Sequence, residues 1–222
     1  MTQKRGAEWQ QPGSPASLVR ELLAKGIHDK RLLEAFTRVR RADFVPEEFV
    51  SEAYRDEPVS IGLGQVTSQP SLIALMVQGL RLKGTETVLE IGTGFGFQTA
   101  ILSMLCRQVF SIERLPDLAM AAESNLRKTR IENATVVVGD GSLGLPDHAP
   151  FEAIIVSAAA PDVPQPLVDQ LKDGGRLVQP IGPAGDEVVT GFQKTEGRLI
   201  RQEELTGAYF VPLLGTFGVS KR

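Results

Sequence analysis

The chain has 222 residues, of which 42% are hydrophobic and 23% charged, and its formal net charge at pH 7 is -3. This composition is typical of a folded globular protein with a sizeable core, and it excludes an intrinsically disordered chain. The weak negative charge disfavours a general nucleic-acid-binding or membrane-surface protein, because such proteins are usually basic.

The amino-terminal region predicts a tail followed by two helices. Residues 1–15 are expected to be a tail, and residues 1–13 lack the apolar stretch of a signal peptide. Ser17 is predicted to cap a helix that runs to residue 25, and Asp29 is predicted to cap a second helix. Proline and glycine then interrupt residues 44–65, which are expected to form an extended, loop-rich segment.

From residue 70 onward, helical and strand-like segments alternate. Such alternation predicts an α/β fold with a mostly parallel, doubly wound sheet, and the final hairpin predicts an antiparallel edge. The expected helices are 70–80, 97–106, 116–129 and 166–172, and the expected strands are 87–91, 109–113, 135–138, 153–157, 176–180, 188–193 and 199–204, followed by an extended piece at 209–214.

Cys106 is the only cysteine, so an intramolecular disulfide is impossible, and we interpret it as a buried helix thiol. The chain has no apolar run of the roughly 18–20 residues that a membrane helix needs. We therefore expect a cytoplasmic protein, and the length predicts one domain.

A glycine-rich loop at residues 90–96 separates one predicted strand from the helix that follows it. Gly92, Gly94 and Gly96 lack side chains, so the backbone can turn sharply and a ligand can approach it closely. Glycine loops also occur as plain turns, so this pattern alone is weak. Ligands bind at the carboxyl ends of the strands in such sheets, which points to this loop and to residues 113, 140–141 and 157–161.

Three carboxylates strengthen the prediction of a nucleoside cofactor, because they lie at the ends of three successive predicted strands. Glu113 can accept hydrogen bonds from two ribose hydroxyls, and Asp140 with Gly141 suits the edge of an adenine. Glu90 would disfavour a pyrophosphate and would suit the ammonium and sulfonium of S-adenosylmethionine. The alternative is a dinucleotide-dependent oxidoreductase, but its motif is usually G-x-G-x-x-G, whereas the spacing here is G-x-G-x-G.

From about residue 18 to residue 214 the chain resembles the protein-L-isoaspartate (D-aspartate) O-methyltransferase family. The most specific matching motifs are Gly64-Gln65, Ser68-Gln69-Pro70 and the Phe-Val-Pro-Leu segment at 210–213. The glycine and acidic motifs mark methyltransferases of this class in general. Further matching segments are 41–46, 61–65, 88–94, 111–114, 139–141, 149–151 and 170–171.

The resemblance implies a Rossmann-like, S-adenosylmethionine-dependent methyltransferase fold with extra amino-terminal helices. A single domain would span residues 1–222, with helices and a substrate loop at 16–69 and the cofactor-binding core with the carboxyl-terminal strands at 70–222. The implied reaction methylates the free α-carboxylate of L-isoaspartyl and D-aspartyl residues in damaged proteins and so initiates repair. Its partners would be isoaspartyl proteins and peptides, with no nucleic acid or membrane, and we expect a monomer.

The resemblance also implies a set of site residues, with Ser68 as the active-site hydroxyl and with no metal. S-adenosylmethionine, and its product S-adenosylhomocysteine, would be bound by Glu90, Gly92, Thr93, Gly94, Gly96, Glu113, Arg114, Asp140 and Gly141. The substrate would be bound by Ile61, Gly62, Gln65, Thr67, Val211, Pro212 and Leu213.

Two departures from the family pattern concern the substrate rather than the cofactor. The family usually has Gly-Gln-Thr-Ile-Ser-Gln-Pro, and in this chain Val66 replaces the threonine and Thr67 the isoleucine. The family's glycine loop usually reads Gly-Ser-Gly-Tyr, and here Phe95 replaces the serine and Phe97 the tyrosine. An alternative is therefore a carboxyl methyltransferase of the same fold that acts on a different peptide or small-molecule carboxylate. A cofactor-binding protein without catalysis is a third reading, which the presence of Ser68 and the acidic residues disfavours.

The chemistry of carboxylate methylation fits these residues. A carboxylate has a reference pKa of about 4 and is already ionised at neutral pH, so no general base is required. Only two histidines occur, and neither lies in a motif. Ser68 lies just before Pro70, where a helix amino terminus would favour an anion. The alternative is that Ser68 only caps this helix.

Overall fold

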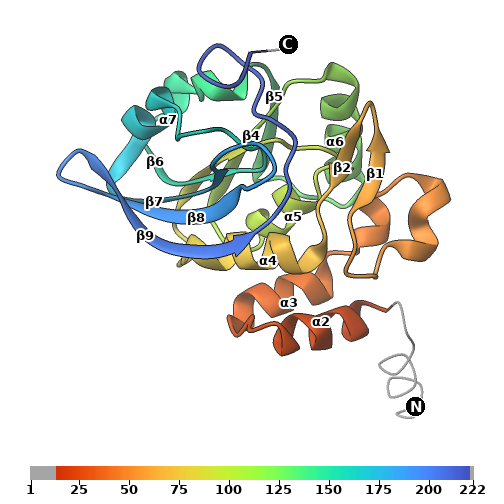
Figure 1. The fold of residues 1–222 in the computed structure, drawn as a ribbon. Helices are drawn as coiled ribbons and strands as arrows, with labels where there is room; N and C mark the ends of the chain where they lie inside the picture. The colour runs from red at the N-terminus through yellow and green to blue at the C-terminus, as the bar shows by residue number, and fades with distance from the viewer. Residues whose placement is uncertain (1–13, 221–222) are drawn as a thin grey trace.

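The computed structural model describes residues 14–220, and its centre is a seven-stranded sheet in the order β5-β4-β3-β6-β7-β8-β9 (Figure 1). Neighbouring strands are parallel from β5 to β7, and β8 and β9 extend the sheet as an antiparallel edge. The predicted fold class is therefore confirmed. The strands are β3 (Thr87–Ile91), β4 (Gln108–Glu113), β5 (Ala134–Val138), β6 (Phe151–Val156), β7 (Leu171–Ile181), β8 (Val188–Thr195) and β9 (Arg198–Gly207).

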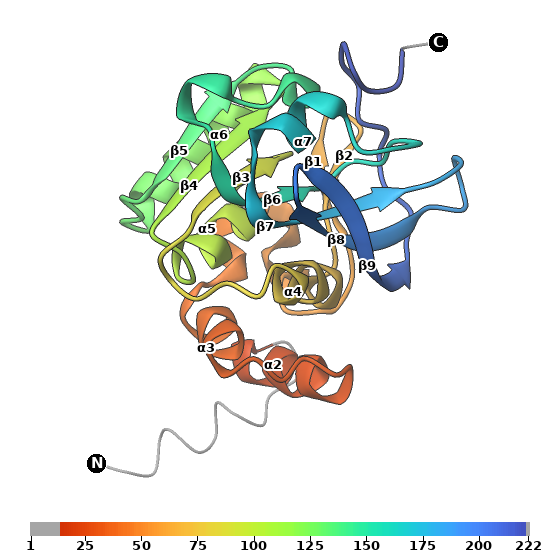
Figure 2. The same ribbon diagram turned by 90° about the vertical axis from the view of Figure 1, so that its left-hand side faces the viewer.

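Helices cover both faces of the sheet (Figure 2) because successive side chains of a buried strand point to opposite faces. In β3, Val88 belongs to the same core cluster as Ile73 and Ile101, whereas Leu89 belongs to the cluster that contains Leu167. The first face is covered by α4 (Pro70–Gly79), α5 (Phe97–Ser103) and α6 (Pro116–Lys128), and the second by α7 (Gln165–Gln170).

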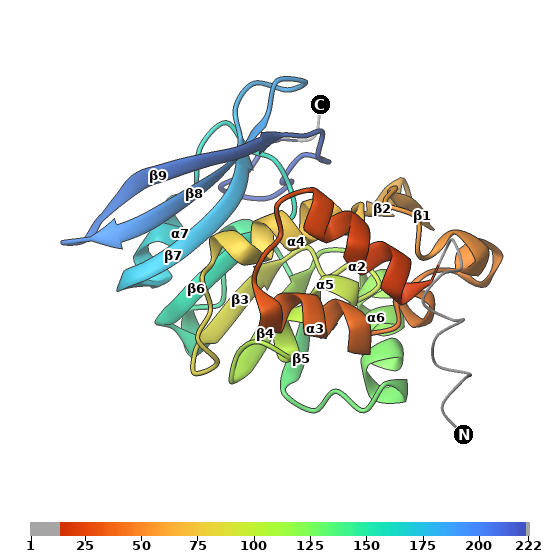
Figure 3. The same cartoon turned by 90° about the horizontal axis from the view of Figure 1, so that it is seen from below.

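Two amino-terminal helices, α2 (Pro15–Ala24) and α3 (Lys30–Arg38), pack outside α4 (Figure 3). Asp29 caps α3, as predicted. The predicted start of α2 is wrong: Ser14 is the N-cap, and Ser17 is the third helical residue and completes a capping box with it. Pro15 can open the helix because the first helical N–H has no partner within a helix. The rest of the predicted tail, residues 1–13, lies outside the described residues.

The segment expected to be loop-rich contains ordered elements. Two 3-10 helices, η1 (Arg41–Phe44) and η2 (Glu47–Glu52), precede a hairpin of β1 (Val59–Gly62) and β2 (Gln65–Thr67). The hairpin was not predicted, because its turn contains Leu63 at φ 52° followed by Gly64 at φ 72°. Leucine rarely adopts a positive φ, so this turn lacks the usual sequence signal.

Two other boundaries differ from the sequence prediction. Cys106 is buried, as predicted. Helix α5 ends at Ser103, however, so this cysteine lies after the helix and not within it. Strand β7 begins at Leu171, and Gly174-Gly175 lies inside it instead of separating it from α7. A register shift in the pairing of β6 with β7 accommodates these residues. None of the helices between residues 14 and 220 has the length and apolar character needed to cross a bilayer.

The topology places a crevice at the centre of the sheet. Strand β3 lies between β4 and β6, so the chain leaves β3 toward one edge of the sheet and later returns to its other side. Crevices at such switch points bind ligands in α/β proteins.

Candidate active site

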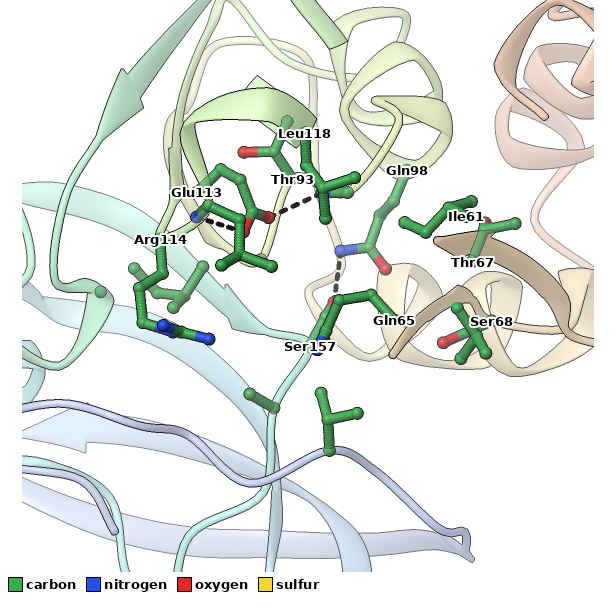
Figure 4. Close-up of a pocket in the computed structure, with 18 of the residues that line it drawn as sticks. Ile61, Gln65, Thr67, Ser68, Thr93, Gln98, Glu113, Arg114, Leu118 and Ser157 are labelled. Atoms are coloured by element: carbon green, nitrogen blue, oxygen red, sulfur yellow. Dashed lines mark hydrogen bonds between the residues drawn. The ribbon is translucent and has the colours of Figure 1, made fainter. Parts of the chain in front are cut away.

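A cavity of about 280 Å³ lies at the carboxyl ends of β3, β4 and β6. Its volume is close to the lower end of the range for small-molecule pockets, roughly 300–1,000 Å³. Figure 4 shows side chains from the hairpin, the sheet and the helices around it. The predicted site residues that line it are Ile61, Gln65, Thr67, Ser68, Gly92, Thr93, Gly94, Glu113, Arg114, Gly141, Val211, Pro212 and Leu213.

The glycine loop approaches the cavity with its backbone in left-handed conformations. The φ angles of Gly92 and Gly94 are 95° and 56°. Such angles favour glycine, so the sequence pattern reflects a backbone requirement. Gly96 was predicted to bind the cofactor, but it does not line the cavity. A Cβ added there would lie 3.5 Å from the Cβ of Ala122, so this glycine faces α6.

The carboxylate of Glu113 joins the glycine loop to the end of β4. Its Oε2 accepts a hydrogen bond from Gly94 N at 3.0 Å, and its Oε1 accepts one from Leu115 N at 3.0 Å. Each carboxylate oxygen can accept a second hydrogen bond. The arrangement is thus compatible with two ribose hydroxyls as donors, and the ribose-binding role of Glu113 stays a prediction.

Glu90 does not line the cavity, so its direct contact with a cationic ligand stays a prediction that the geometry does not favour. Its side chain follows Val88 onto the α5 face of β3 and is fully buried. Oε1 accepts a hydrogen bond from Gln98 Nε2 at 2.9 Å, and Oε2 accepts hydrogen bonds from Ser111 Oγ at 2.7 Å and from Thr99 Oγ1. Burial raises the pKa of Glu90 to about 7, although these three donors act in the opposite direction.

Gln98 and Ser157 line the cavity and were absent from the predicted site. Gln98 Nε2 donates to Ser157 Oγ at 2.9 Å, which links α5 to the segment after β6. Ser157 lies in the range that the strand-end rule indicated. Gln98 lies inside a predicted helix, where no sequence signal separates a cavity-lining glutamine from a surface one.

Asp140 is oriented away from the cavity, whereas Gly141 lines it. Oδ1 of Asp140 accepts a hydrogen bond from Ser142 N at 2.9 Å, and Oδ2 accepts one from Thr216 N at 2.7 Å. The carboxylate therefore anchors the carboxyl-terminal segment in this structure. A direct contact between this carboxylate and adenine stays a prediction that the geometry does not favour.

Ser68 lies at the cavity between β2 and α4, but it does not cap α4. The N-cap residue is Gln69, and its side chain makes no capping bond. The helix is capped from a distant segment, because Ser71 N donates to Asp56 Oδ1 at 2.7 Å. The helix terminus is thus not open to an anion in the way the sequence suggested. Gly62, predicted to bind substrate, is exposed and does not line the cavity.

The fully buried guanidinium of Arg41 supports the backbone of Ser68. Nη2 donates to Ser68 O and to Glu57 O, both at 3.0 Å, and Nη1 donates to Ala53 O and to Arg55 O, both at 3.1 Å. Burial lowers the pKa of Arg41 to about 10, so it stays cationic at neutral pH. The sequence marked Arg41 only as part of a matching segment and predicted no role for it.

Comparison with protein families identifies this arrangement. The model of the family described as Protein-L-isoaspartate(D-aspartate) O-methyltransferase (PCMT) matches residues 14–217. The chain belongs to this family. It is 50% identical over 193 residues to the protein-L-isoaspartate O-methyltransferase of Myxococcus xanthus, covering 86% of this chain and 91% of that protein. The enzyme of the same name from Methanoculleus marisnigri is 46% identical over 198 residues, covering 89% and 90%.

Solved structures agree with this assignment. A protein-L-isoaspartate O-methyltransferase superposes with a TM-score of 0.81 at 28% identity, covering 92% of this chain and 67% of that chain. A Plasmodium falciparum protein described as a putative member, in complex with S-adenosyl-L-homocysteine, gives a TM-score of 0.78 at 26% identity and covers 89% and 97%. The predicted family, methyltransferase fold and S-adenosylmethionine cofactor are confirmed.

The buried carboxylate of Glu90 predicts a distinct pH dependence of stability. Its folded pKa is raised from 4.5 to about 7, so between these values the unfolded chain is ionised while the folded protein keeps the proton. The Glu90 contribution to the free energy of unfolding is therefore full below pH 4.5 and is lost as the pH rises to 7, by about 3 kcal/mol. Glu90→Gln should remove this loss, measured by urea unfolding of the ligand-free protein at pH 4.5 and 7.5. Parallel pH profiles for the two proteins would contradict the assignment.

Gly141 and Gly139 form a matched pair for testing the packing beneath the cavity. A Cβ at Gly141 would lie 2.3 Å from Ile91 Cγ2, whereas one at Gly139 would lie 3.8 Å from Ile112 Cγ2. Overpacking typically costs about 1–3 kcal/mol. Gly141→Ala should therefore lower the melting temperature and weaken S-adenosylhomocysteine binding about tenfold or more by calorimetry, and Gly139→Ala should change the Kd less than twofold. Equal behaviour of the two variants would exclude this packing constraint.

Proposed function

We propose that this protein transfers the methyl group of S-adenosylmethionine to the free α-carboxylate of L-isoaspartyl and D-aspartyl residues in damaged proteins. The observation that carries the proposal is the place of Ser68, which lines the cofactor cavity and also a neighbouring groove of about 620 Å³. Val66 also lines both the cavity and the groove. A polypeptide in the groove would present a carboxylate to the cofactor cavity beside Ser68.

The groove has the character expected of a polypeptide site. Leu72 and Leu75 of α4 line it together with Leu205 and the residues up to Tyr209, and Lys25, whose Nζ is paired with Asp56, also lines it. Tyr209 is 85% exposed, so it is available for contact with a partner. The mixture of apolar and polar side chains suits a chain of varied sequence. These groove residues were absent from the predicted site.

A buried positive charge lies beside the backbone of Ser68. The Arg41 guanidinium lies behind it, with Nη2 3.0 Å from the Ser68 carbonyl oxygen. When bound, S-adenosylmethionine supplies an electrophilic methyl group on a sulfonium. A carboxylate oxygen forms the new bond to this methyl while the carbon–sulfur bond breaks, and the two opposite charges are neutralised. Ionised carboxylates need no general base, so the residues around the cavity act by alignment, which can supply roughly 7–11 kcal/mol.

The two substitutions in the family motif are compatible with this proposal. Thr67 is 8% exposed and lines the cavity, whereas Val66 is 51% exposed and lies where the cavity meets the groove. A threonine is therefore retained at the cavity, one residue later than in the usual motif. We also propose that the protein acts as a monomer in the cytoplasm, on isoaspartyl proteins and peptides and without nucleic acid or membrane partners.

A pair of peptides with one sequence tests the function directly. One peptide contains isoaspartate and the other contains normal aspartate, and both are incubated with S-adenosylmethionine labelled in its methyl group. We expect base-labile methyl ester only on the isoaspartyl peptide. Transfer to neither peptide, in a preparation that binds S-adenosylhomocysteine, would reject the proposal and favour another carboxylate as the acceptor.

Ser68→Ala tests the active-site hydroxyl. Loss of a hydrogen bond to a charged group costs about 1.5–3 kcal/mol, so kcat/KM for the isoaspartyl peptide should fall roughly ten- to a hundredfold. Binding of S-adenosylhomocysteine should change less than twofold, and Ser51→Ala in exposed η2 should match the wild type. An unchanged kcat/KM in Ser68→Ala would remove this serine from the mechanism.

A further inference from the structure

Gln98 is the point where the buried Glu90 network reaches the cavity. It is the second residue of α5, is 7% exposed and lines the cavity. Its Nε2 donates to Glu90 Oε1 and to Ser157 Oγ, both at 2.9 Å. Both N–H bonds of the amide are therefore used within the protein, one toward β3 and one toward the segment after β6.

These two bonds fix the orientation of the amide. A primary amide has two N–H donors and one carbonyl oxygen. Because Nε2 donates to both Glu90 Oε1 and Ser157 Oγ, the nitrogen faces these two residues and the carbonyl oxygen faces elsewhere. In Figure 4 the nitrogen of Gln98 points toward Ser157 and its oxygen points away from Ser157. Gln98 lines the cavity and both of its N–H donors are used within the protein, so its carbonyl oxygen is the group left to bind a ligand.

The hydrogen bond to Glu90 strengthens this acceptor. Glu90 is fully buried, and its other oxygen is occupied by Ser111 and Thr99. A carboxylate that accepts from an amide N–H polarises the amide, and its carbonyl oxygen becomes a better acceptor. A cation beside Gln98 would therefore be bound by the polarised carbonyl oxygen, without direct contact with the Glu90 carboxyl group.

We propose that Gln98 Oε1 binds the α-ammonium of S-adenosylmethionine and that Glu90 and Ser157 hold its amide in the orientation this requires. The inference rests on the cofactor and not on the identity of the methyl acceptor. Within the cofactor's amino-acid part, the ammonium requires acceptors and the carboxylate requires donors. Glu113, from β4, would hold the ribose, and Gln98 and Ser157 would hold the amino-acid end.

Three ligands separate this role from a general effect on the cavity. S-adenosylhomocysteine carries the ammonium and the carboxylate, decarboxylated S-adenosylhomocysteine carries only the ammonium, and methylthioadenosine carries neither. Calorimetric Kd values are compared for the wild type and Gln98→Leu. We expect at least a tenfold loss for the two ammonium ligands and less than a twofold change for methylthioadenosine. Gln108→Leu, at the opposite end of β4, is the control for replacing a glutamine and should leave all three Kd values unchanged.

Several outcomes would overturn the inference. An unchanged Kd for S-adenosylhomocysteine in Gln98→Leu, or an equal loss for all three ligands, would show that Gln98 does not recognise the ammonium. If Gln98→Leu fails to fold, Gln98→Asn keeps an amide but withdraws it by one methylene, and the same ranking of the three ligands is expected. No peptide is present in these measurements, so failure of the isoaspartyl assay would leave them unaffected.

Discussion

The buried carboxylate of Glu90 ties together the central strand, its neighbour and the helix that follows the glycine loop. It accepts hydrogen bonds from Ser111 of β4 and from Gln98 and Thr99 of α5. Burying a charge is expensive unless its hydrogen-bonding capacity is satisfied. These donors reduce that cost, and the remaining penalty raises the pKa of the group. This polar network thus supports the start of the glycine loop on its α5 side, while Gly92 and Gly94 line the cavity.

A second buried charge organises the acceptor side of the site. The Arg41 guanidinium binds four carbonyl oxygens in segments that surround Ser68, and Asp56 caps α4 from the same region. The irregular chain between α3 and α4 therefore has a defined backbone without long helices or strands. This support explains how a short hairpin and a serine between two elements can form a wall of the cavity.

The carboxyl-terminal segment completes the site from the opposite side. Val211 O accepts a hydrogen bond from Ala159 N at 2.8 Å, and Leu213 N donates to Ala159 O at 2.7 Å, so this segment runs beside the chain that follows β6. Asp140 holds the turn after it through Thr216. The cavity is consequently built from segments that are distant in the sequence, and its closure depends on contacts outside the glycine motif.

The alternation of apolar strands and helices was sufficient to predict the sheet, because burial on both faces imposes a local pattern on each strand. The glycine loop and Glu113 were also predictable, since strand ends converge at the switch point. Sequence alone did not distinguish Glu90, which faces α5, from a cavity-lining acid, nor did it reveal Gln98, Arg41 or the groove beside Ser68. Their roles depend on which side chains meet across elements far apart in the chain. Only the tertiary structure decides those contacts, because they arise from packing and not from any local preference.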